Sequence, residues 1–290
     1  MDTKMLKYIG NSLYKTHILK EYKRYIVFQV RCRLHSKYID DILNFFDAND
    51  LRRRMLLGCP SLVEQTTRSF FYKGSTWDER IKLVKNHIQI LEDKYDSKLL
   101  ESLYASNERI RVWEDSYLDK PLGMDLWFDS GQRKEGCLSL VLNYEGEELY
   151  QIMFWLNKNK AGEVALYIGA LQGPKNGSEI IKDLTKAFFG YRTKNLIFYG
   201  IRCVSEALGV KEIYAVSNEG YYAMNHIRRD RKLKTDFGEF WQECEGVISD
   251  DKRFYVIPVE EARKPLEEIA SKKRAQYRRR FAKLDVKRKK

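Results

Sequence analysis

The sequence predicts an α+β fold in which a helical N-terminal part precedes a mixed, mostly antiparallel sheet flanked by helices, with a basic C-terminal helix or tail. Three observations lead to this prediction. Apolar residues recur at helical spacing before about residue 113, short apolar or alternating runs follow residue 120, and lysine and arginine dominate the last residues. The spacing of apolar residues is therefore typical of helices in the first part of the chain and of strands in the second part.

The composition indicates a folded globular protein. Of 290 residues, 43% are hydrophobic and only five are proline, so the core can be substantial. No apolar run reaches the roughly 18 residues that a membrane-spanning helix needs, and the N-terminus lacks the apolar core of a signal peptide. We therefore expect a cytoplasmic protein. The five cysteines are odd in number, widely spaced and contain no C-x-x-C pair, so neither a disulfide framework nor a zinc site is indicated and we expect reduced thiols.

The positive charge is concentrated at the C-terminus. The chain has a net charge of +12, but residues 271–290 hold 11 of its 53 Lys and Arg and a single acid, so the remaining body carries only +2. Any attraction to an acidic partner should therefore be local to this segment. We expect a helical region over residues 1–120, an α/β domain over 121–265 and a basic tail over 266–290.

Three helices are expected in the first part, over residues 38–46, 62–71 and 78–91. Their apolar residues recur three and four positions apart. Two of the starts carry capping residues. Ser61 follows a break at Gly58-Cys59-Pro60, and Thr76 has Glu79 at capping-box distance.

Three antiparallel strands are expected next, over residues 137–144, 149–156 and 164–171. They are apolar or alternating runs separated by polar, glycine-containing turns. Two helices and a strand should follow, over residues 180–190, 194–208 and 212–216, with Gly209 placed as a helix C-cap. Beyond them we expect a helix over 221–231, an apolar segment over 237–241 and a final strand over 253–259.

The loop after the third strand is the first candidate for a ligand site. A glycine-containing loop between a strand end and a helix start exposes backbone N–H groups and the positive helix terminus to a phosphate, although many such loops are plain turns. Arg192, beyond the next helix, can add a cation or simply complement a helix end. The candidate loop residues are Gln172, Gly173, Lys175, Asn176, Gly177 and Ser178.

This order of elements resembles the GNAT acyltransferase superfamily. That superfamily has Gln or Arg at the start of the loop motif and two small residues three and five positions later; Gln172 and Gly177 match, whereas Lys175 replaces the first glycine. The resemblance implies that the loop holds the pyrophosphate of an acyl-CoA. The sheet would then be GNAT-like, with acyl-CoA or an acyl carrier protein as donor and no metal.

The chain also resembles the bacterial VirK/YbjX family over most of the region from about Leu122 to Phe281. That family is linked to virulence, resistance to antimicrobial peptides and altered lipid envelopes. The chain departs from the pattern at Phe189 and Tyr221, where members often have histidine, so the carry-over of catalytic residues stays open. The resemblance is carried by Ile168 to Pro174, Thr185-Lys186 with Gly190 and Arg192, Val216 to Asn218, and Lys273 to Arg280.

Acyl transfer requires an oxyanion donor, a base for the nucleophile and an acid for the departing thiolate. The GNAT resemblance assigns the acid to a tyrosine after the fifth strand, here Tyr221 or Tyr222, although such a pair is often ordinary packing. Glu219 and His226 are the nearest candidate bases. Backbone N–H groups of a bulged strand near residues 170–172 would serve the oxyanion.

The remaining histidines show no metal-binding spacing, and His87 lies on the apolar face of its helix, where a hydrogen-bonded core histidine is expected. Two functions of different class therefore stand. One is an acyltransferase with a peptide amine or envelope lipid as acceptor. The other is a non-catalytic module that binds anionic membrane, peripherally at the inner membrane, or an acidic partner through residues 271–290. Nucleic-acid binding is not expected, since the body is nearly neutral and no recognition signature is present.

Overall fold

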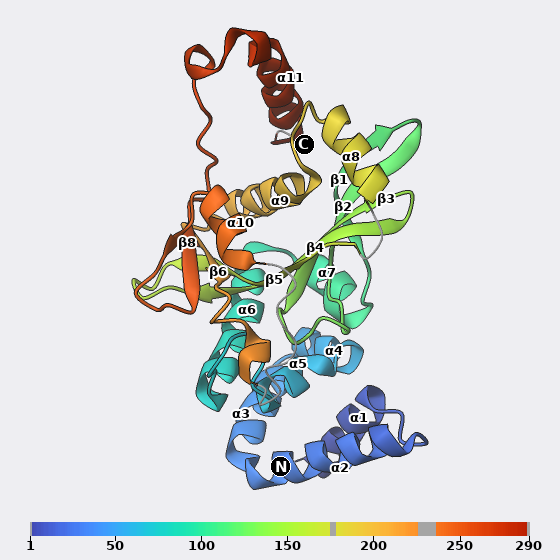
Figure 1. The fold of residues 1–290 in the computed structure, drawn as a ribbon. Coiled ribbons are helices and arrows are strands. Elements are labelled where there is room, and N and C mark those ends of the chain that lie inside the picture. The colour runs from blue at the N-terminus through green and yellow to red at the C-terminus, as the bar shows by residue number, and fades with distance from the viewer. Residues whose placement is uncertain (1, 175–177, 226–235, 289–290) are drawn as a thin grey trace.

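The computed structural model describes residues 2–174, 178–225 and 236–288, which fold into helices around one sheet (Figure 1). The helices are α1 Thr3–Leu13, α2 Leu19–Leu34, α3 Ser36–Asp47, α4 Asp50–Gly58, α5 Ser61–Glu64, α6 Trp77–Lys94, α7 Ser97–Leu100, α8 Ser178–Ala187, α9 Thr193–Ala207, α10 Phe237–Glu243 and α11 Ser271–Arg288. Single turns are η1 Gln65–Thr67, η2 Glu101–Ala105, η3 Tyr222–Asn225 and η4 Leu266–Glu268.

The described strands form an open eight-stranded sheet in the order β1-β2-β3-β4-β5-β6-β8-β7. The sheet is antiparallel except between β5 and β6, which pair in parallel. The predicted mixed, mostly antiparallel sheet in an α+β fold is therefore confirmed. The strands are β1 Ile110–Tyr117, β2 Lys120–Trp127, β3 Leu138–Tyr144, β4 Glu147–Lys158, β5 Val164–Gln172, β6 Glu212–Val216, β7 Val247–Ile248 and β8 Phe254–Ile257.

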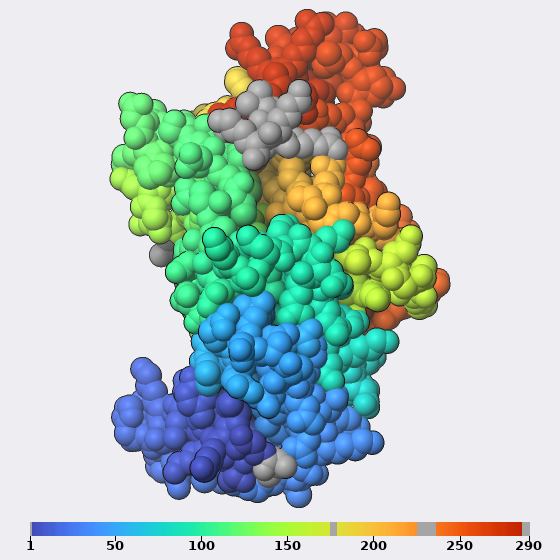
Figure 2. Space-filling model, turned by 180° about the vertical axis from the view of Figure 1, so that it is seen from behind, coloured from blue at the N-terminus to red at the C-terminus, as the bar shows by residue number. Residues whose placement is uncertain are grey.

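Helices cover both faces of the sheet. α6 lies on one face, where the backbone N–H of Leu156 donates to Nδ1 of His87 over 3.0 Å. α9 lies on the other, so close that a Cβ on Gly200 would come within 2.5 Å of the Met124 sulfur. Figure 1 shows α9 and α10 on one side of the sheet and α3 to α6 on the other. Seen from behind in Figure 2, the N-terminal helices and α11 form opposite ends of an elongated molecule.

Most predicted elements are found with small shifts at their ends, because their apolar periodicity coincides with burial in the core. The capping box of Thr76 and Glu79 is present at the start of α6. β1, β2, β7, α1, α2, α4 and α7 were not predicted, and α10 was expected only as an apolar segment. β1 belongs to the sheet although it precedes residue 121, and the division into domains at that residue stays a prediction.

Two predicted helices differ from the structure. The helix expected over residues 62–71 ends at Glu64, and a 3₁₀ turn continues only to Thr67. The chain leaves the helix because Phe71, at a φ of 69°, donates its N–H to the carbonyl of Lys134 over 2.8 Å. Of the helix expected over residues 221–231, the structure has only the 3₁₀ turn η3; residues 226–235 lie outside the described residues.

α11 packs back on the body of the molecule. The carbonyl of Phe189, after α8, accepts hydrogen bonds from Gln276 at 2.9 Å and from Arg280 at 2.7 Å. Lys283 forms an ion pair with Asp115 of β1 at 3.4 Å, and Leu284 is fully buried. The basic C-terminal segment is therefore a docked helix up to Arg288.

Within the described ranges, no helix combines the length and apolar character that crossing a bilayer demands. The five cysteines are free thiols, as predicted, and all but Cys203 are buried. In the same part of the chain, no group of three or more His, Cys, Asp and Glu side chains could hold a metal ion.

Candidate functional site

The candidate site lies where β5 and β6 separate. The two strands pair only from Ala165 to Ile168 and from Glu212 to Ala215. Beyond Ile168, a register shift against β4 leaves Gly169 as an extra residue, so that β5 bulges and continues along β4 to Gln172. Beyond β6 the chain no longer pairs with β5, and Tyr221 forms an isolated antiparallel β-bridge with Tyr72. The carboxyl ends of neighbouring parallel strands are a common place for a ligand.

A buried carboxyl group joins the two separated chain segments. Glu135, in the loop between β2 and β3, is 3% exposed. One of its oxygens accepts a short hydrogen bond from the Tyr221 hydroxyl, and the other accepts from Nε2 of Gln172 at 2.8 Å. The amide of Gln172 also exchanges two hydrogen bonds with Gln132, at 3.0 and 3.1 Å. Gln172 therefore holds the Glu135 carboxyl group in position.

Burial sets the proton affinities of this pair. It raises the pKa of Glu135, against the opposing effect of the hydrogen bonds from Tyr221 and Gln172. Burial also raises the pKa of Tyr221, and the adjacent Glu135 charge adds to the rise. A carboxylate with a raised pKa is a better proton acceptor, and a phenol with a raised pKa stays protonated. The site therefore holds a proton acceptor hydrogen-bonded to a protonated phenol, which is an arrangement that general acid–base chemistry uses.

The N-terminal helices hold the loop that carries Glu135. Nε2 of Gln65, in η1, donates to the carbonyls of Arg133 at 2.7 Å and Gly136 at 2.6 Å. Arg133 pairs over 2.6 Å with Glu64, whose side chain is completely buried. The backbone N–H of Phe71 also donates a hydrogen bond to the Lys134 carbonyl. The loop is thus fixed at both sides of Glu135 by residues far away in sequence.

Glycine allows this loop to lie directly on the bulge. A Cβ on Gly169 would come within 1.8 Å of the Glu135 carbonyl oxygen, and one on Gly136 within 2.6 Å of the Phe154 backbone nitrogen. Real Cβ atoms do not approach backbone this closely, so both positions require glycine. The bulge in β5 and the placement of Glu135 therefore depend on each other.

The other face of the sheet contributes a tyrosine and a cation. Because Gln151 pairs with Gln172 and shares its face, the preceding residue Tyr150 projects from the opposite face. Its ring lies 3.0 Å from where a Cβ on Gly173 would be. Burial raises the pKa of Tyr150, and the nearby Arg192 guanidinium opposes the rise. Arg192 itself also forms an ion pair with Glu243 of α10.

The structure brings together only some of the residues predicted for this site. Gln172 and Tyr221 meet through Glu135, and the Tyr222 ring lies 4.9 Å from that of Tyr221, centroid to centroid. Glu219 instead faces outward, 68% exposed, and pairs with Lys73 at 3.4 Å. Ser178 is the first residue of α8. The predicted residues Lys175, Asn176, Gly177 and His226 lie outside the described residues.

Glu135 was not predicted from the sequence. It stands in a polar loop, Gly131-Gln-Arg-Lys-Glu-Gly136, that has the composition of a solvent-exposed turn. The only local signal is the pair of glycines around four polar residues, which is common in turns without function. Burial of Glu135 results from Gln65, Phe71 and the bulge at Gly169, none of which is near it in sequence.

Comparison with known proteins gives a match over nearly the whole chain. The family described as "Protein of unknown function (DUF535)" matches residues 17–290. The chain belongs to this family. The membership of the VirK/YbjX family that the sequence motifs indicated is thereby confirmed. One similar protein is "Uncharacterized protein YbjX" of Escherichia coli (strain K12), which is 29% identical over 260 residues, covering 88% of this chain and 77% of the relative.

Two further relatives come from Haemophilus influenzae, each described as "Uncharacterized protein". One is 28% identical over 258 residues, 87% of this chain and 84% of its own length. The other is 26% identical over 196 residues, 64% of both chains. The family motifs that are distant in sequence meet in the fold, since Gln276 and Arg280 of α11 both contact the Phe189 carbonyl just before Gly190.

Proposed function

We propose that the protein is an acyltransferase of GNAT type that transfers an acyl group from acyl-CoA or an acyl carrier protein to an amine or hydroxyl of a peptide or envelope lipid. The observation that carries this proposal is the hydrogen-bonded pair of buried Glu135 and half-buried Tyr221 at the end where the parallel strands β5 and β6 separate. The bulge at Gly169 and the connection from β5 to α8 support it, since the sequence resemblance to the GNAT superfamily leads us to expect a bulged central strand followed by a donor-binding loop.

The proposed reaction uses the pair for both proton transfers. The acceptor nitrogen or oxygen forms a bond to the thioester carbon, and its proton passes to the Glu135 carboxylate. Backbone N–H groups of the bulged segment near Ala170 stabilise the oxyanion. The carbon–sulfur bond then breaks, and the thiolate takes the Tyr221 hydroxyl proton. Tyr221 regains a proton from Glu135 through their hydrogen bond, which restores both groups.

The donor site is tested by calorimetric titration with CoA, acetyl-CoA and a long-chain acyl-CoA, and with an acylated carrier protein. We expect micromolar binding of one donor that is lost when Gly173 and Gly177 are both replaced by Val. At Gly173 such a change fills the approach to the backbone where phosphate would lie, next to Tyr150. Absence of binding by every donor, or equal binding by the double variant, would contradict the proposal.

The chemical step is tested by acyl transfer to a lysine-containing peptide and to an amine-bearing lipid. We expect Glu135→Gln and Tyr221→Phe to retain donor binding but to lower the transfer rate by about 10²- to 10⁴-fold. Tyr214→Phe is the matched control, because Tyr214 also donates its hydroxyl to a glutamate, Glu212, at 2.7 Å but lies within the parallel pair, opposite Tyr167, and makes no hydrogen bond to Glu135. Full activity of Tyr221→Phe would remove Tyr221 as the acid.

The second candidate is a non-catalytic module that binds an acidic surface through α11. It is favoured by four exposed cations that form no ion pair with any described residue: Lys272, Lys273, Arg278 and Arg279. Arg280 and Lys283, by contrast, hold the helix on the body. The variant Arg278→Glu with Arg279→Glu should abolish binding to an acidic partner while leaving the fold unchanged, because both side chains are exposed.

A further inference from the structure

The outer side of α2 carries a row of exposed large apolar side chains. Leu19 and Leu34, at the two ends of the helix, are 71% and 76% exposed. Between them the row repeats at intervals of three and four residues and so follows one side of the helix. We call this row the α2 stripe; it consists of Leu19, Tyr22, Ile26, Val27, Val30 and Leu34.

The stripe is not the side by which α2 attaches to the protein. The opposite side holds Phe28 and Cys32, which are fully buried, and Gln29, whose amide donates to the Leu6 carbonyl of α1 over 2.8 Å. α2 therefore has one apolar side for the core and a second one that no described part of the chain covers. Exposed apolar surface of this extent marks an interaction site.

Basic side chains border the stripe. α2 contains five Lys and Arg and a single acid, Glu21, which Arg24 already engages in an ion pair. By helical spacing Lys23 lies within the stripe, where its long methylene chain can pack along the apolar residues while the ammonium group stays in water. The remaining cations beside the stripe are Lys20, Arg31 and Arg33.

We propose that α2 docks the protein on an anionic lipid surface, with the stripe inserted at the boundary between headgroups and acyl chains. A helix with an apolar side, basic flanks and few acids is the form that binds such a surface. A second copy of this chain fits less well, because a two-fold contact between two α2 helices would bring Lys20, Lys23 and Arg31 of both copies together. The basic residues beside the stripe therefore favour an anionic lipid surface over a second copy of this chain.

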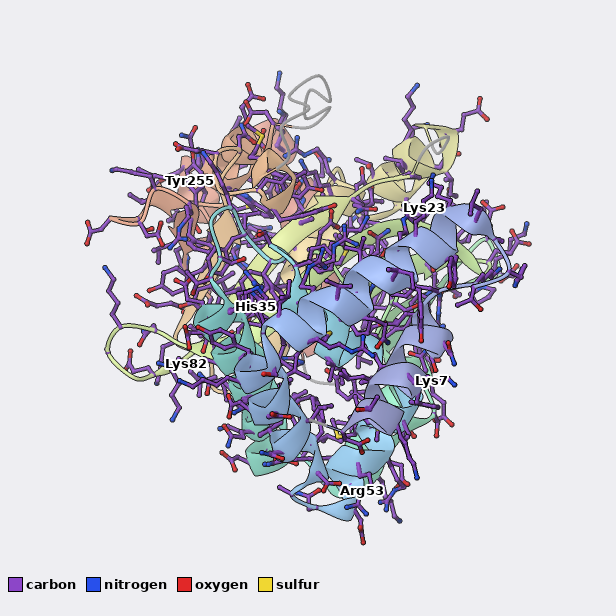
Figure 3. All side chains as sticks on the ribbon, turned by 90° about the horizontal axis from the view of Figure 1, so that it is seen from below. Lys7, Lys23, His35, Arg53, Lys82 and Tyr255 are labelled. Carbon is purple, nitrogen blue, oxygen red and sulfur yellow. The ribbon has the colours of Figure 1, made fainter. Side chains whose placement is uncertain are left out.

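The location of α2 suits a flat surface. Figure 3 looks at this end of the molecule and shows α2 running across it, from beyond Lys23 to His35. Figures 1 and 2 place α11 at the far end of the molecule. One flat membrane cannot contact both ends, so lipid binding through α2 leaves the cations of α11 facing away from that membrane.

The proposal is tested by vesicle flotation with the full chain, using phosphatidylcholine vesicles with and without phosphatidylglycerol. We expect binding only to the anionic vesicles. Ile26→Gln with Val30→Gln should weaken that binding by about tenfold or more, because it removes inserted apolar area. Lys20→Glu with Lys23→Glu should also weaken it, and raised salt should act in the same direction.

Two control variants separate α2 from other surfaces. Leu118→Gln with Val247→Gln changes two apolar residues that are 71% and 69% exposed outside α2, and it should leave flotation unchanged. Arg278→Glu with Arg279→Glu in α11 should leave it unchanged as well. The proposal is overturned if wild type does not float, if the α11 variant alone stops flotation, or if the Ile26 and Val30 variant floats normally. Light scattering that finds a dimer broken by the same variant would assign the stripe to a second copy instead.

Discussion

Glu135 owes its properties to residues that are remote in the sequence. Its carboxyl group is buried by a loop that Gln65 and Phe71 hold in place, and it meets Tyr221 only after the whole sheet has formed. Tyr221 could be predicted, because its position just after a strand is visible in the sequence. Its partner Glu135, whose charge adds to the effect of burial in raising the pKa of Tyr221, could not be predicted, since a glutamate in a polar loop is normally exposed.

His87 is a core residue with a defined tautomer. Its Nδ1 accepts from the Leu156 backbone N–H, so Nε2 carries the proton and donates to the Tyr104 hydroxyl at 2.7 Å. Tyr104 in turn donates to the Cys137 carbonyl at 3.1 Å. The predicted hydrogen-bonded core histidine is confirmed. Burial lowers the pKa of His87 to about 3, because a charged imidazole would be desolvated there.

This histidine should make the protein less stable in mild acid. Below pH 6.5 the unfolded chain binds a proton at His87 that the folded chain excludes until about pH 3, so stability falls as the pH decreases through this window. The contribution is about 1.4 kcal/mol per pH unit at most. Urea unfolding at several pH values should show a weaker pH dependence for His87→Gln than for wild type.

The matched control for that measurement is His17→Gln, at an exposed position, which should keep the wild-type pH dependence. An unchanged slope in His87→Gln would mean that other groups govern the acid sensitivity.

At the scale of the element, β5 combines three features that support the site. Its first half forms the parallel pair with β6, Gly169 forms the bulge, and Gln172 at its end holds Glu135. The apolar run of this strand was predicted, whereas the bulge was not. A glycine inside a strand only suggests a bulge, and the close approach of the Glu135 backbone decides it.

Gly169→Ala should therefore destabilise the protein by about 2 kcal/mol or more, because the new Cβ would overlap the Glu135 carbonyl oxygen. This oxygen belongs to the backbone and cannot move without displacing the loop. Chemical denaturation measures the loss. Gly131→Ala, in the same loop as Glu135, is the control: its Cβ would meet only the flexible Asp129 carboxylate at 3.0 Å, so a smaller effect is expected. Similar stability of Gly169→Ala and wild type would argue against the bulge.

Three of the missed elements, α2, β1 and β2, have sequence patterns that are atypical of the structure they form. α2 has apolar residues on both its buried and its exposed side, so its sequence shows no single helical stripe. β1 and β2 carry charged residues, proline and glycine within their spans, which is atypical of strands. The pairing of β2 with β3, and of β1 with β2, stabilises these strands where local propensity does not.

At the scale of the whole molecule, the N-terminal helices and the sheet are joined by hydrogen bonds and packing. His87 satisfies the Leu156 N–H in β4, and Lys73 donates its N–H to the Gly220 carbonyl at 2.8 Å. Trp155 of β4 is 1% exposed and packs against Phe71 at 5.4 Å between ring centroids. Removal of the helices would expose this aromatic core and leave buried backbone groups unpaired.

A fragment of residues 107–290 should consequently fail to fold by itself. We expect it to lack near-ultraviolet circular dichroism and a cooperative denaturation curve, both of which the full chain should have. A fragment that unfolds cooperatively would instead indicate an independent domain and would leave the N-terminal helices as an addition to it.

The sequence by itself determined the class of fold, the position of most strands and of the helices α3, α6, α8 and α9, the C-terminal charge and the family. These properties depend on periodicity, composition and local motifs, which a single chain segment carries. The tertiary structure alone decided that Glu135 is buried beside Tyr221, that Gly169 bulges and that α2 keeps an apolar side uncovered. Burial depends on what packs against a residue, and here the packing partners lie tens of positions away along the chain.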